Sequence, residues 1–255
     1  MFEVAFIQEQ GAGRLDIEAR MVRDACLRRD IPVELFTRKR IARRQLPLDP
    51  RSYVFGDVDC AQGAMRQLGI PVPAPDYYPD ILEPYLHRRI WSERLGNLRD
   101  RIMEGGEPIF AKPALRPKLF TGMVFSGPGD FYFANGASRS EPVWCSEIVR
   151  WRSEYRVYVM GGRILSIDHY DGDPSVTIDR AVVERAVVER AIADLAGSGK
   201  ALAGYGIDFG VLATGQTALV EANEGYALGA YGIDGDLYAA LTFARWRELL
   251  GTITA

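Results

Sequence analysis

At 255 residues, 47% of them hydrophobic and 25% charged, the chain has the composition of a globular protein that can bury a large core. Its 31 basic and 34 acidic side chains give a formal charge of -3, which excludes the overall basic field typical of nucleic-acid binding. The three cysteines form no CxxC pair, and no stretch resembles a secretory signal or a membrane span, so we expect a cytoplasmic protein that binds neither nucleic acid nor membranes.

The first third of the chain predicts a parallel α/β domain. The expected elements are strands over 4–7, 33–36 and 53–55 and helices over 16–29 and 60–68. This β-α-β rhythm is typical of a parallel sheet with helical crossovers. The proline density of residues 71–84 is incompatible with a regular helix or a central strand. We therefore predict a domain boundary there, with residues 1–75 before it.

A charged helix is expected over residues 85–103, and a candidate phosphate-binding segment follows it. The predicted strand 109–113 carries Lys112. The loop after it adds three residues suited to phosphate: Lys118, Thr121 and Gly122. Ammonium groups offset phosphate charge, and small residues let backbone N–H groups approach. The segment does not match the P-loop motif, which disfavours a P-loop nucleotidase.

The next strands carry an acid beside a base. A strand is expected over 143–149, followed by a hairpin over 155–167. Glu154 and Arg156 share one face of the first arm, and a two-residue turn would put His169 opposite Glu154. The pair is either a surface ion pair of little energetic worth or a ribose acceptor beside a phosphate donor. We interpret His169 as a structural or substrate-orienting residue.

Two helices are expected in the last third of the chain, over 179–196 and 237–250. The first of them is expected to bury an apolar stripe formed by Val188, Ala191, Ile192 and Leu195.

The most informative stretch is the predicted hairpin over residues 204–225, with its turn at 214–215. A two-residue turn puts Asp208 directly opposite Glu221, with Asn223 on the same face. Opposed carboxylates destabilise a bare sheet, so a cation is expected between them. Hard oxygen ligands of this kind are what Mg²⁺ prefers, usually together with phosphate oxygens. The alternative is a solvent-facing acidic pair on an edge hairpin.

The order of these motifs resembles the ATP-grasp superfamily, and more narrowly a clade of small stand-alone ATP-grasp proteins. The motifs are Lys112, KLFTG at 118–122, SEIV at 146–149, EYR at 154–156, DFG at 208–210 and EAN at 221–223. The resemblance covers the chain from about Arg88 onward. It implies an ATP-grasp domain over residues 76–255, with ATP between two α+β subdomains, after the α/β domain that precedes it in the family.

The resemblance also implies how ATP would be held. Lys112 would contact the α- and β-phosphates. Three loop residues would close over the β- and γ-phosphates: Lys118, Thr121 and Gly122. The amino edge of adenine would meet Glu147, Ile148 and Val149. Glu154 would accept the ribose hydroxyls. Many relatives carry a further lysine near residues 88–89, and either Arg88 or Arg89 would replace it; we choose Arg89.

By the same resemblance, Mg²⁺ would be held by Asp208, Glu221 and Asn223. The groups that would act on the transferred phosphoryl are Arg156, Lys112 and Lys118. Such a site activates a carboxylate as an acyl-phosphate, which an amine captures to give an amide or peptide bond. The expected substrates are small-molecule or peptide carboxylates and amines. A kinase using the same nucleotide site and a non-catalytic ATP sensor are the alternatives.

Overall fold

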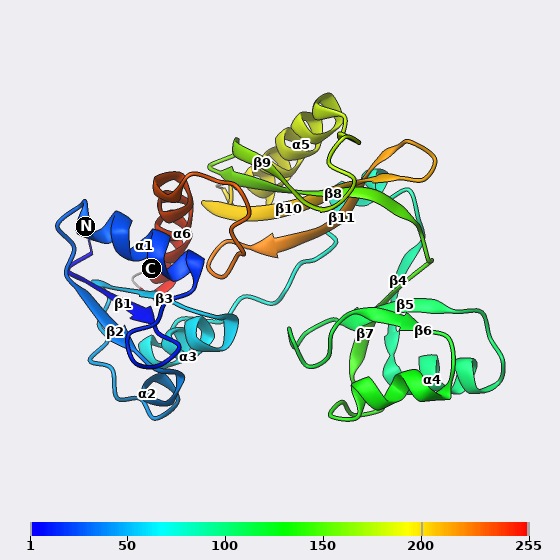
Figure 1. Cartoon of the computed structure of the whole chain (residues 1–255), viewed down its shortest axis with the longest axis horizontal. Coiled ribbons are helices and arrows are strands. Elements are labelled where there is room, and N and C mark those ends of the chain that lie inside the picture. Colours follow the sequence, from blue (N-terminus) through cyan, green and yellow to red (C-terminus); the bar gives the residue numbers. More distant parts are fainter. Residues whose placement is uncertain (1, 200, 254–255) are drawn as a thin grey trace.

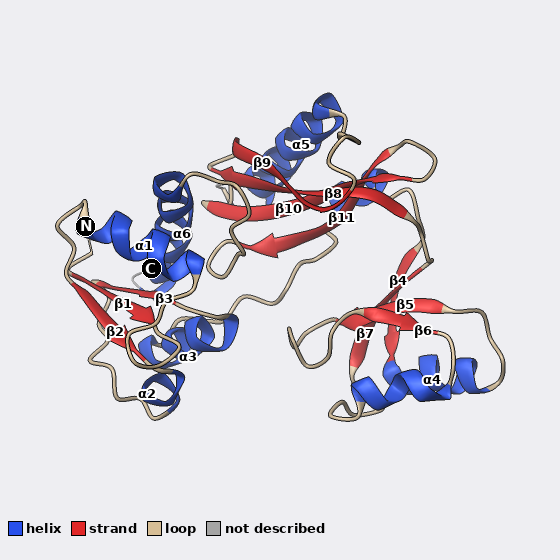
Figure 2. Cartoon of the chain, in the orientation of Figure 1, coloured by secondary structure: helices blue, strands red, loops and turns tan. Residues whose placement is uncertain are grey.

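A computed structural model of the chain describes residues 2–199 and 201–253 and contains three β-sheets (Figures 1 and 2). A parallel sheet lies at the N-terminal end, and two four-stranded antiparallel sheets follow, which we call the middle sheet and the third sheet. The helices of these two sheets lie on their outer sides, so the sheets themselves are turned toward each other.

The N-terminal sheet confirms the predicted parallel α/β arrangement. Its strands, in the order β2-β1-β3, are β1 (Val4–Gln8), β2 (Val33–Phe36) and β3 (Ser52–Phe55). Its helices are α1 (Ile17–Leu27), α2 (Arg38–Ala42) and α3 (Val58–Leu68). Asp16 and Asp57 cap α1 and α3, each accepting a hydrogen bond from a first-turn N–H.

The C-terminal helix α6 (Gly235–Leu250) packs in the core of this first sheet (Figure 1). Trp246 is 1% exposed, and its indole N–H donates to the carbonyl of Ser52 over 2.9 Å. The Tyr53 hydroxyl donates to Thr242 Oγ1, also over 2.9 Å. The N-terminal sheet therefore shares its core with the last helix of the chain.

The predicted helix over 85–103 is wrong in its first half. The linker ends in a 3₁₀ helix (Asp80–Tyr85), and strand β4 (Ile90–Arg94) precedes helix α4 (Leu95–Met103). Ile90 and Trp91 are residues that favour strands, and they pair with β7. The helix begins only where apolar residues recur at helical spacing, and these are Leu95, Leu98 and Ile102.

The middle sheet has the order β4-β7-β5-β6, and α4 covers its outer face. Its other strands are β5 (Ile109–Pro113), β6 (Met123–Phe125) and β7 (Pro142–Ser146). A 3₁₀ helix (Pro128–Ala134) follows β6. The prediction of β5 is confirmed. Strand β7 ends three residues before the predicted end, because residues 147–150 leave the middle sheet and lead into the third.

The third sheet has the order β11-β10-β8-β9. Its strands are β8 (Trp151–Met160), β9 (Arg163–Gly172), β10 (Gly204–Leu212) and β11 (Thr217–Glu224). Helix α5 (Arg180–Ser198) covers its outer face. The predicted buried stripe of α5 is wrong, since Val188, Ile192 and Leu195 are more than half exposed. The face that is buried consists of Val183, Ala186, Val187 and Arg190.

The β10–β11 register confirms that Asp208 lies opposite Glu221, although the turn differs from the prediction. The loop has three residues, because Leu212 N–H donates to the carbonyl of Gln216 over 2.9 Å. Near the turn the strands are therefore one residue out of the predicted register. An irregularity beside Asp208 leaves Val220 unpaired and restores it.

The β8–β9 register differs from the prediction. His169 lies opposite Tyr155 instead of Glu154, and Glu154 pairs with Asp171. Two irregularities cause the shift, because each inserts one extra residue into β9. The His169 ring packs edge-on against Tyr155 with ring centroids 5.2 Å apart, in keeping with a structural role.

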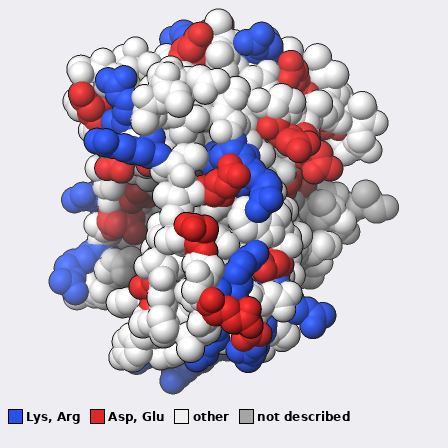
Figure 3. Space-filling view, turned by 90° about the vertical axis from the view of Figure 1, so that its right-hand side faces the viewer, with Lys and Arg blue, Asp and Glu red and all other residues white. Residues whose placement is uncertain are grey.

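The surface and the helices carry no sign of a membrane or polyanion contact where the structure can be inspected. On the face shown in Figure 3, acidic and basic side chains are interspersed, as the near-balanced composition leads one to expect. None of the helices in the described part of the chain combines the length and the apolar character that crossing a membrane requires.

Candidate active site

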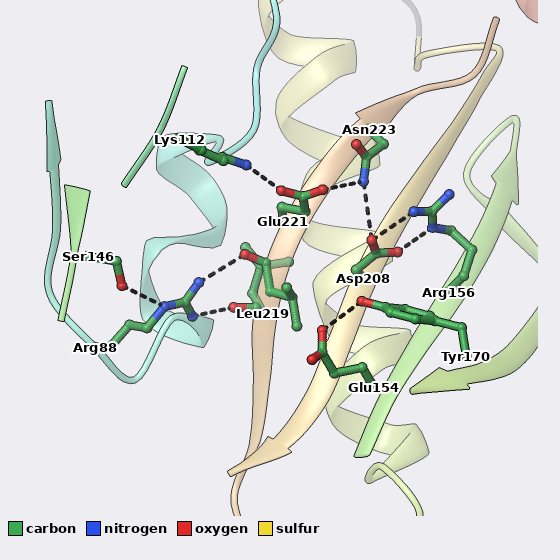
Figure 4. Close-up of polar contacts among 11 residues, drawn as sticks. Arg88, Lys112, Ser146, Glu154, Arg156, Tyr170, Asp208, Leu219, Glu221 and Asn223 are labelled. Atoms are coloured by element: carbon green, nitrogen blue, oxygen red, sulfur yellow. Dashed lines mark hydrogen bonds and ion pairs between the residues drawn. The ribbon is translucent and has the colours of Figure 1, made fainter. Parts of the chain in front are cut away.

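Two carboxylates and an amide converge on the inner face of the third sheet (Figure 4). Asp208 on β10 lies opposite Glu221 on β11, and Asn223 follows two residues later. The Asn223 amide nitrogen lies 3.3 Å from Asp208 Oδ2 and 3.2 Å from Glu221 Oε1. The three side chains expected to hold Mg²⁺ therefore lie together as one cluster, which we call the acidic cluster.

Each carboxylate of the acidic cluster is paired with a cation. Arg156 on β8 lies opposite Asp208 and binds both of its oxygens, and the Nη2–Oδ2 distance is 2.8 Å. Lys112 reaches across from β5 of the middle sheet to Glu221. The Arg156, Asp208 and Lys112 side chains are all at most 10% exposed. Two predicted catalytic cations thus meet the predicted metal ligands, one from each antiparallel sheet.

The surroundings of the two carboxylates separate their acidities. Burial raises the pKa of Asp208 to about 6; Arg156 opposes this rise, and nearby Glu221 and Glu154 reinforce it. For Glu221, burial also acts to raise the pKa, but Lys112 and Asn223 outweigh it and hold the pKa below its usual value. Glu221 is therefore ionised at neutral pH, and ionised Asp208 depends on a neighbouring positive charge.

The donor chemistry of the acidic cluster fits Mg²⁺. Carboxylate and amide oxygens are hard ligands, and Mg²⁺ is usually bound by one or two carboxylates plus phosphate oxygens. A half-turn of the Asn223 amide presents its oxygen instead of its nitrogen. Among the described residues, His, Cys, Asp and Glu side chains form no group of three suited to a metal ion. A site here therefore needs the amide and ligand oxygens besides the two acids.

A cavity of about 240 Å³ lies beside the acidic cluster, and we call it the first cavity. It is lined by Tyr78, Arg88, Phe110, Val124, Ser146, Glu147, Ile148, Val149, Trp151, Glu154, Val220 and Glu221. The lining comes from both antiparallel sheets and from the segment that joins them. It includes the residues expected to meet adenine and ribose.

The polar groups of the first cavity are held in place by neighbours. Glu147 Oε2 accepts a hydrogen bond from the Arg89 backbone N–H over 3.0 Å. The Tyr170 hydroxyl donates to Glu154 Oε2 over 2.7 Å (Figure 4). Burial raises the pKa of Glu154, and the hydrogen bond from Tyr170 acts against that rise. The carboxylate expected to meet ribose is thus fixed before any ligand binds.

Arg88, and not Arg89, lies in the first cavity. Its guanidinium donates to the backbone carbonyls of Leu219 and Val220 over 2.6 and 2.9 Å and to Ser146 Oγ over 3.2 Å. It therefore ties the third sheet to the middle sheet. Arg89 is exposed, and its guanidinium lies 4.5 Å from the ring centroid of Trp91.

The predicted phosphate loop lies next to Lys112. A Cβ added to Gly122 would lie 2.9 Å from Phe110 Cζ and 3.1 Å from Lys112 Cβ, so only glycine lets the loop approach this closely. Lys118 and Thr121 are exposed. The structure brings Gly122 to the acidic cluster's lysine and leaves the other two side chains on the loop surface.

Two linker tyrosines were missed by the sequence analysis. Lys112 Nζ lies 3.6 Å from the ring centroid of Tyr77 and 4.7 Å from that of Tyr78. The Tyr77 carbonyl accepts a hydrogen bond from Ala222 N–H over 2.8 Å, so the linker extends the third sheet beyond β11. The available signal was a pair of aromatic residues inside a proline-rich linker, where bulky rings need a burial partner.

Comparison with known proteins identifies the family of the chain. Residues 85–241 match an ATP-grasp domain family, the second family of its clade within the superfamily. No curated protein sequence matches the chain. Among solved structures, D-cycloserine synthetase DcsG has a similar fold, with a TM-score of 0.63 and 13% identity over 96% of this chain and 99% of that one.

Two further structures share the fold. A RimK domain ATP-grasp protein from Sphaerobacter thermophilus aligns with a TM-score of 0.55 and 17% identity over 94% of this chain and 99% of its own. D-alanyl-alanine synthetase A from Vibrio cholerae aligns with a TM-score of 0.54 and 14% identity over 99% of this chain and 97% of its own. At these identities the likeness concerns the fold, whereas the family match spans more than half of the chain. The chain therefore belongs to the ATP-grasp superfamily, in the clade family whose domain it matches.

Proposed function

We propose that the protein is an ATP- and Mg²⁺-dependent ligase that joins a carboxylate to an amine through an acyl-phosphate. The observation that carries this proposal is the convergence of the acidic cluster with Lys112 and Arg156 at one end of the first cavity. The similar folds of two enzymes named as synthetases support it.

ATP fits this site with its base in the first cavity. The adenine amino edge would meet the segment from Glu147 to Val149, and the ribose hydroxyls would donate to Glu154. Arg88 lines the same cavity and offsets the charge of the two acids there. The phosphates would then run past Glu221 toward Lys112, which lies at the boundary between the two sheets.

The acidic cluster would hold Mg²⁺ through Asp208, Glu221 and the amide oxygen of Asn223. When bound there, the ion would offset charge on the phosphate oxygens. Lys112 and Arg156 are the cations placed to bind phosphoryl oxygens, since they lie against the same carboxylates. Removing one such group typically raises the barrier by about 3 kcal/mol, roughly a hundredfold in rate.

The reaction proceeds in two steps. A substrate carboxylate oxygen attacks the γ-phosphorus, the bond to the β-phosphate oxygen breaks, and ADP leaves. The amine then attacks the acyl carbon, a C–N bond forms, the C–O bond to phosphate breaks, and the amine loses a proton. Positioning by Lys112 and Arg156 supplies most of the catalysis in the first step, because phosphoryl transfer depends mainly on alignment and charge.

The test is product analysis with ATP, Mg²⁺ and a panel of carboxylates in the presence of hydroxylamine, which captures acyl-phosphates as hydroxamates. The proposal expects ADP, phosphate and a hydroxamate together for at least one carboxylate. The Glu221→Gln variant should lose all three products. A stable phosphorylated product would show a kinase, and nucleotide binding without ADP formation would show a sensor; either result would overturn the proposal.

A further inference from the structure

A second cavity, of about 90 Å³, lies on the other side of the acidic cluster. The first cavity is bordered by Val220 and Glu221 on β11, whereas the second is bordered by the next residues along the same strand, Ala222, Asn223 and Glu224. Nucleotide phosphates that run from the first cavity along β11 therefore point toward the second. The linker residue Tyr77, whose ring lies over Lys112, also lines it.

We propose that the second cavity binds a small α-amino acid, with its carboxylate on Arg190 and Tyr205 and its amine toward Asp76 and Asn223. This assignment rests on the proposed ligase function and names the amine substrate for it.

The deep end of the cavity presents two buried polar groups whose hydrogen-bonding capacity is unused. Arg190 is 6% exposed and Tyr205 is 3% exposed, and the guanidinium lies 5.1 Å from the tyrosine ring centroid. Within the described part of the chain, Arg190 Nη1 and the Tyr205 hydroxyl have no hydrogen-bond partner. Buried donors without partners cost about 1–3 kcal/mol each, and a carboxylate would satisfy both.

The acids near Arg190 do not fill that role. Arg190 lies 3.5 Å from Asp76 and 3.6 Å from Asp194, which is longer than a good hydrogen bond. Glu224 also lines the cavity, but its carboxylate is bound by Arg245 over 2.8 Å. Arg190 therefore keeps donors for a ligand.

The outer end of the cavity suits an ammonium group. Asp76 lines it with a side chain that is 58% exposed, so this carboxylate is accessible to a ligand. An anion alone would meet the repulsion of Asp76, and a cation alone would leave the Arg190 donors unsatisfied. A ligand that carries both charges satisfies both ends. The remaining walls are largely apolar and the cavity is small, which limits the side chain to a short one.

This orientation is productive for amide formation. With its carboxylate fixed at Arg190, the amino acid would direct its amine toward Asn223, where the acyl-phosphate forms in the proposed reaction. The amine attacks the acyl carbon, the C–N bond forms as the C–O bond to phosphate breaks, and Asp76 or solvent takes the proton. Burial raises the pKa of Asp76, which agrees with a role as proton acceptor.

Isothermal calorimetry of the full chain tests the assignment with glycine and L-alanine as probes, with and without Mg²⁺ and a non-hydrolysable ATP analogue. Propionate lacks the amine and ethylamine lacks the carboxylate, so each should bind at least tenfold more weakly than L-alanine. Tyr205→Phe removes a hydroxyl that has no partner in the described structure, so the fold should be unaffected while L-alanine affinity falls about tenfold. Asp76→Asn should weaken binding by a similar factor.

The matched control is Tyr85→Phe, which removes a hydroxyl bonded to Glu189 outside the cavity and should leave L-alanine binding unchanged. Failure of both amino acids to bind would overturn the inference, as would equal binding by wild type, Tyr205→Phe and Asp76→Asn. In either case, intact Mg²⁺-dependent binding of the ATP analogue would leave the proposed ligase function standing. Loss of nucleotide binding in the wild-type protein would instead remove the proposed function itself.

Discussion

Arg156 and Asp208 lie opposite each other on neighbouring strands, and the guanidinium binds both carboxylate oxygens where the two side chains are 8% and 4% exposed. A buried ion pair of this kind gains little net stability, because desolvation of both charges offsets their attraction. Its value is positional: it holds a cation and a metal-binding carboxylate side by side, ready to exchange partners when phosphate and Mg²⁺ enter.

Mg²⁺-dependent nucleotide binding should weaken below about pH 6. The folded-state pKa of Asp208 is raised from 3.8 to about 6, so the free protein takes up a proton there as the pH falls, and the metal must compete with it. The affinity for an ATP analogue with Mg²⁺ should fall by up to about tenfold per pH unit below 6. Titrations without Mg²⁺ and on Asp208→Asn should lack this component; an unchanged profile in that variant would contradict the assignment.

The same shift has a definite effect on the stability of the free protein. Because the folded pKa lies above the unfolded value, the contribution of Asp208 to stability is complete below about pH 4 and is lost as the pH rises through about 6. Bound Mg²⁺ should reverse that sign, because it favours the ionised carboxylate.

Arg88 and Arg89 form a matched pair for mutagenesis. Arg88→Met should abolish measurable ATP-analogue binding and lower stability, because three hydrogen bonds between the two antiparallel sheets are lost. Arg89→Met removes only an exposed side chain that packs on Trp91, and it should change affinity less than about threefold. Calorimetry and urea unfolding measure both effects. A larger loss of binding for Arg89→Met would favour the sequence-based choice.

Glu154 and Tyr170 should govern recognition of the ribose. Glu154→Gln should weaken ATP binding about tenfold while changing 2′-deoxy-ATP binding much less, because the lost interaction involves the hydroxyl that the deoxynucleotide lacks. Tyr170→Phe keeps the ring stacked on Tyr231, at 4.9 Å between centroids, but removes the hydrogen bond that fixes Glu154. It should reduce the same discrimination in part. Equal discrimination in all three proteins would exclude Glu154 as the ribose acceptor.

The C-terminal helix should control the stability of the N-terminal sheet. Trp246→Ala should cost about 3–5 kcal/mol, since the side chain is 1% exposed and packs on Tyr53 and Ser52. Leu237→Ala on the same helix is a control, because Leu237 is 40% exposed and the change should cost well under half as much. Urea unfolding followed by tryptophan fluorescence and circular dichroism distinguishes the two. Similar losses for both variants would show that the helix is not part of that core.

Local patterns in the sequence were sufficient for the N-terminal sheet and for the hairpin that carries the acids. Alternation and β-branched runs predict those strands, and the opposition of Asp208 and Glu221 is confirmed. That register was predicted from a two-residue turn, however, and the structure reaches it through a three-residue turn and an unpaired Val220. Two one-residue offsets cancel, which no count along the chain could reveal.

Tertiary packing decides the features that the sequence did not predict. Helix α5 has apolar residues on both faces, so periodicity alone could not select the face of Val183 and Ala186 that meets the sheet. Charge density suggested a helix where β4 forms, because the pairing of Ile90 and Trp91 with β7 is a long-range contact. The choice between Arg88 and Arg89 likewise depends on which side chain reaches the carbonyls of β11.

The most direct test of the nucleotide site is calorimetry of a non-hydrolysable ATP analogue, with and without Mg²⁺, on the wild-type protein and on Glu221→Gln. Glu221 is chosen because glutamine keeps its shape while removing the charge that Lys112 and the metal would share. The account predicts tight binding by the wild type only with Mg²⁺ and a loss of at least a hundredfold in the variant. Equal binding by both proteins, or binding that ignores Mg²⁺, would contradict the assignment of Asp208, Glu221 and Asn223 as the metal site.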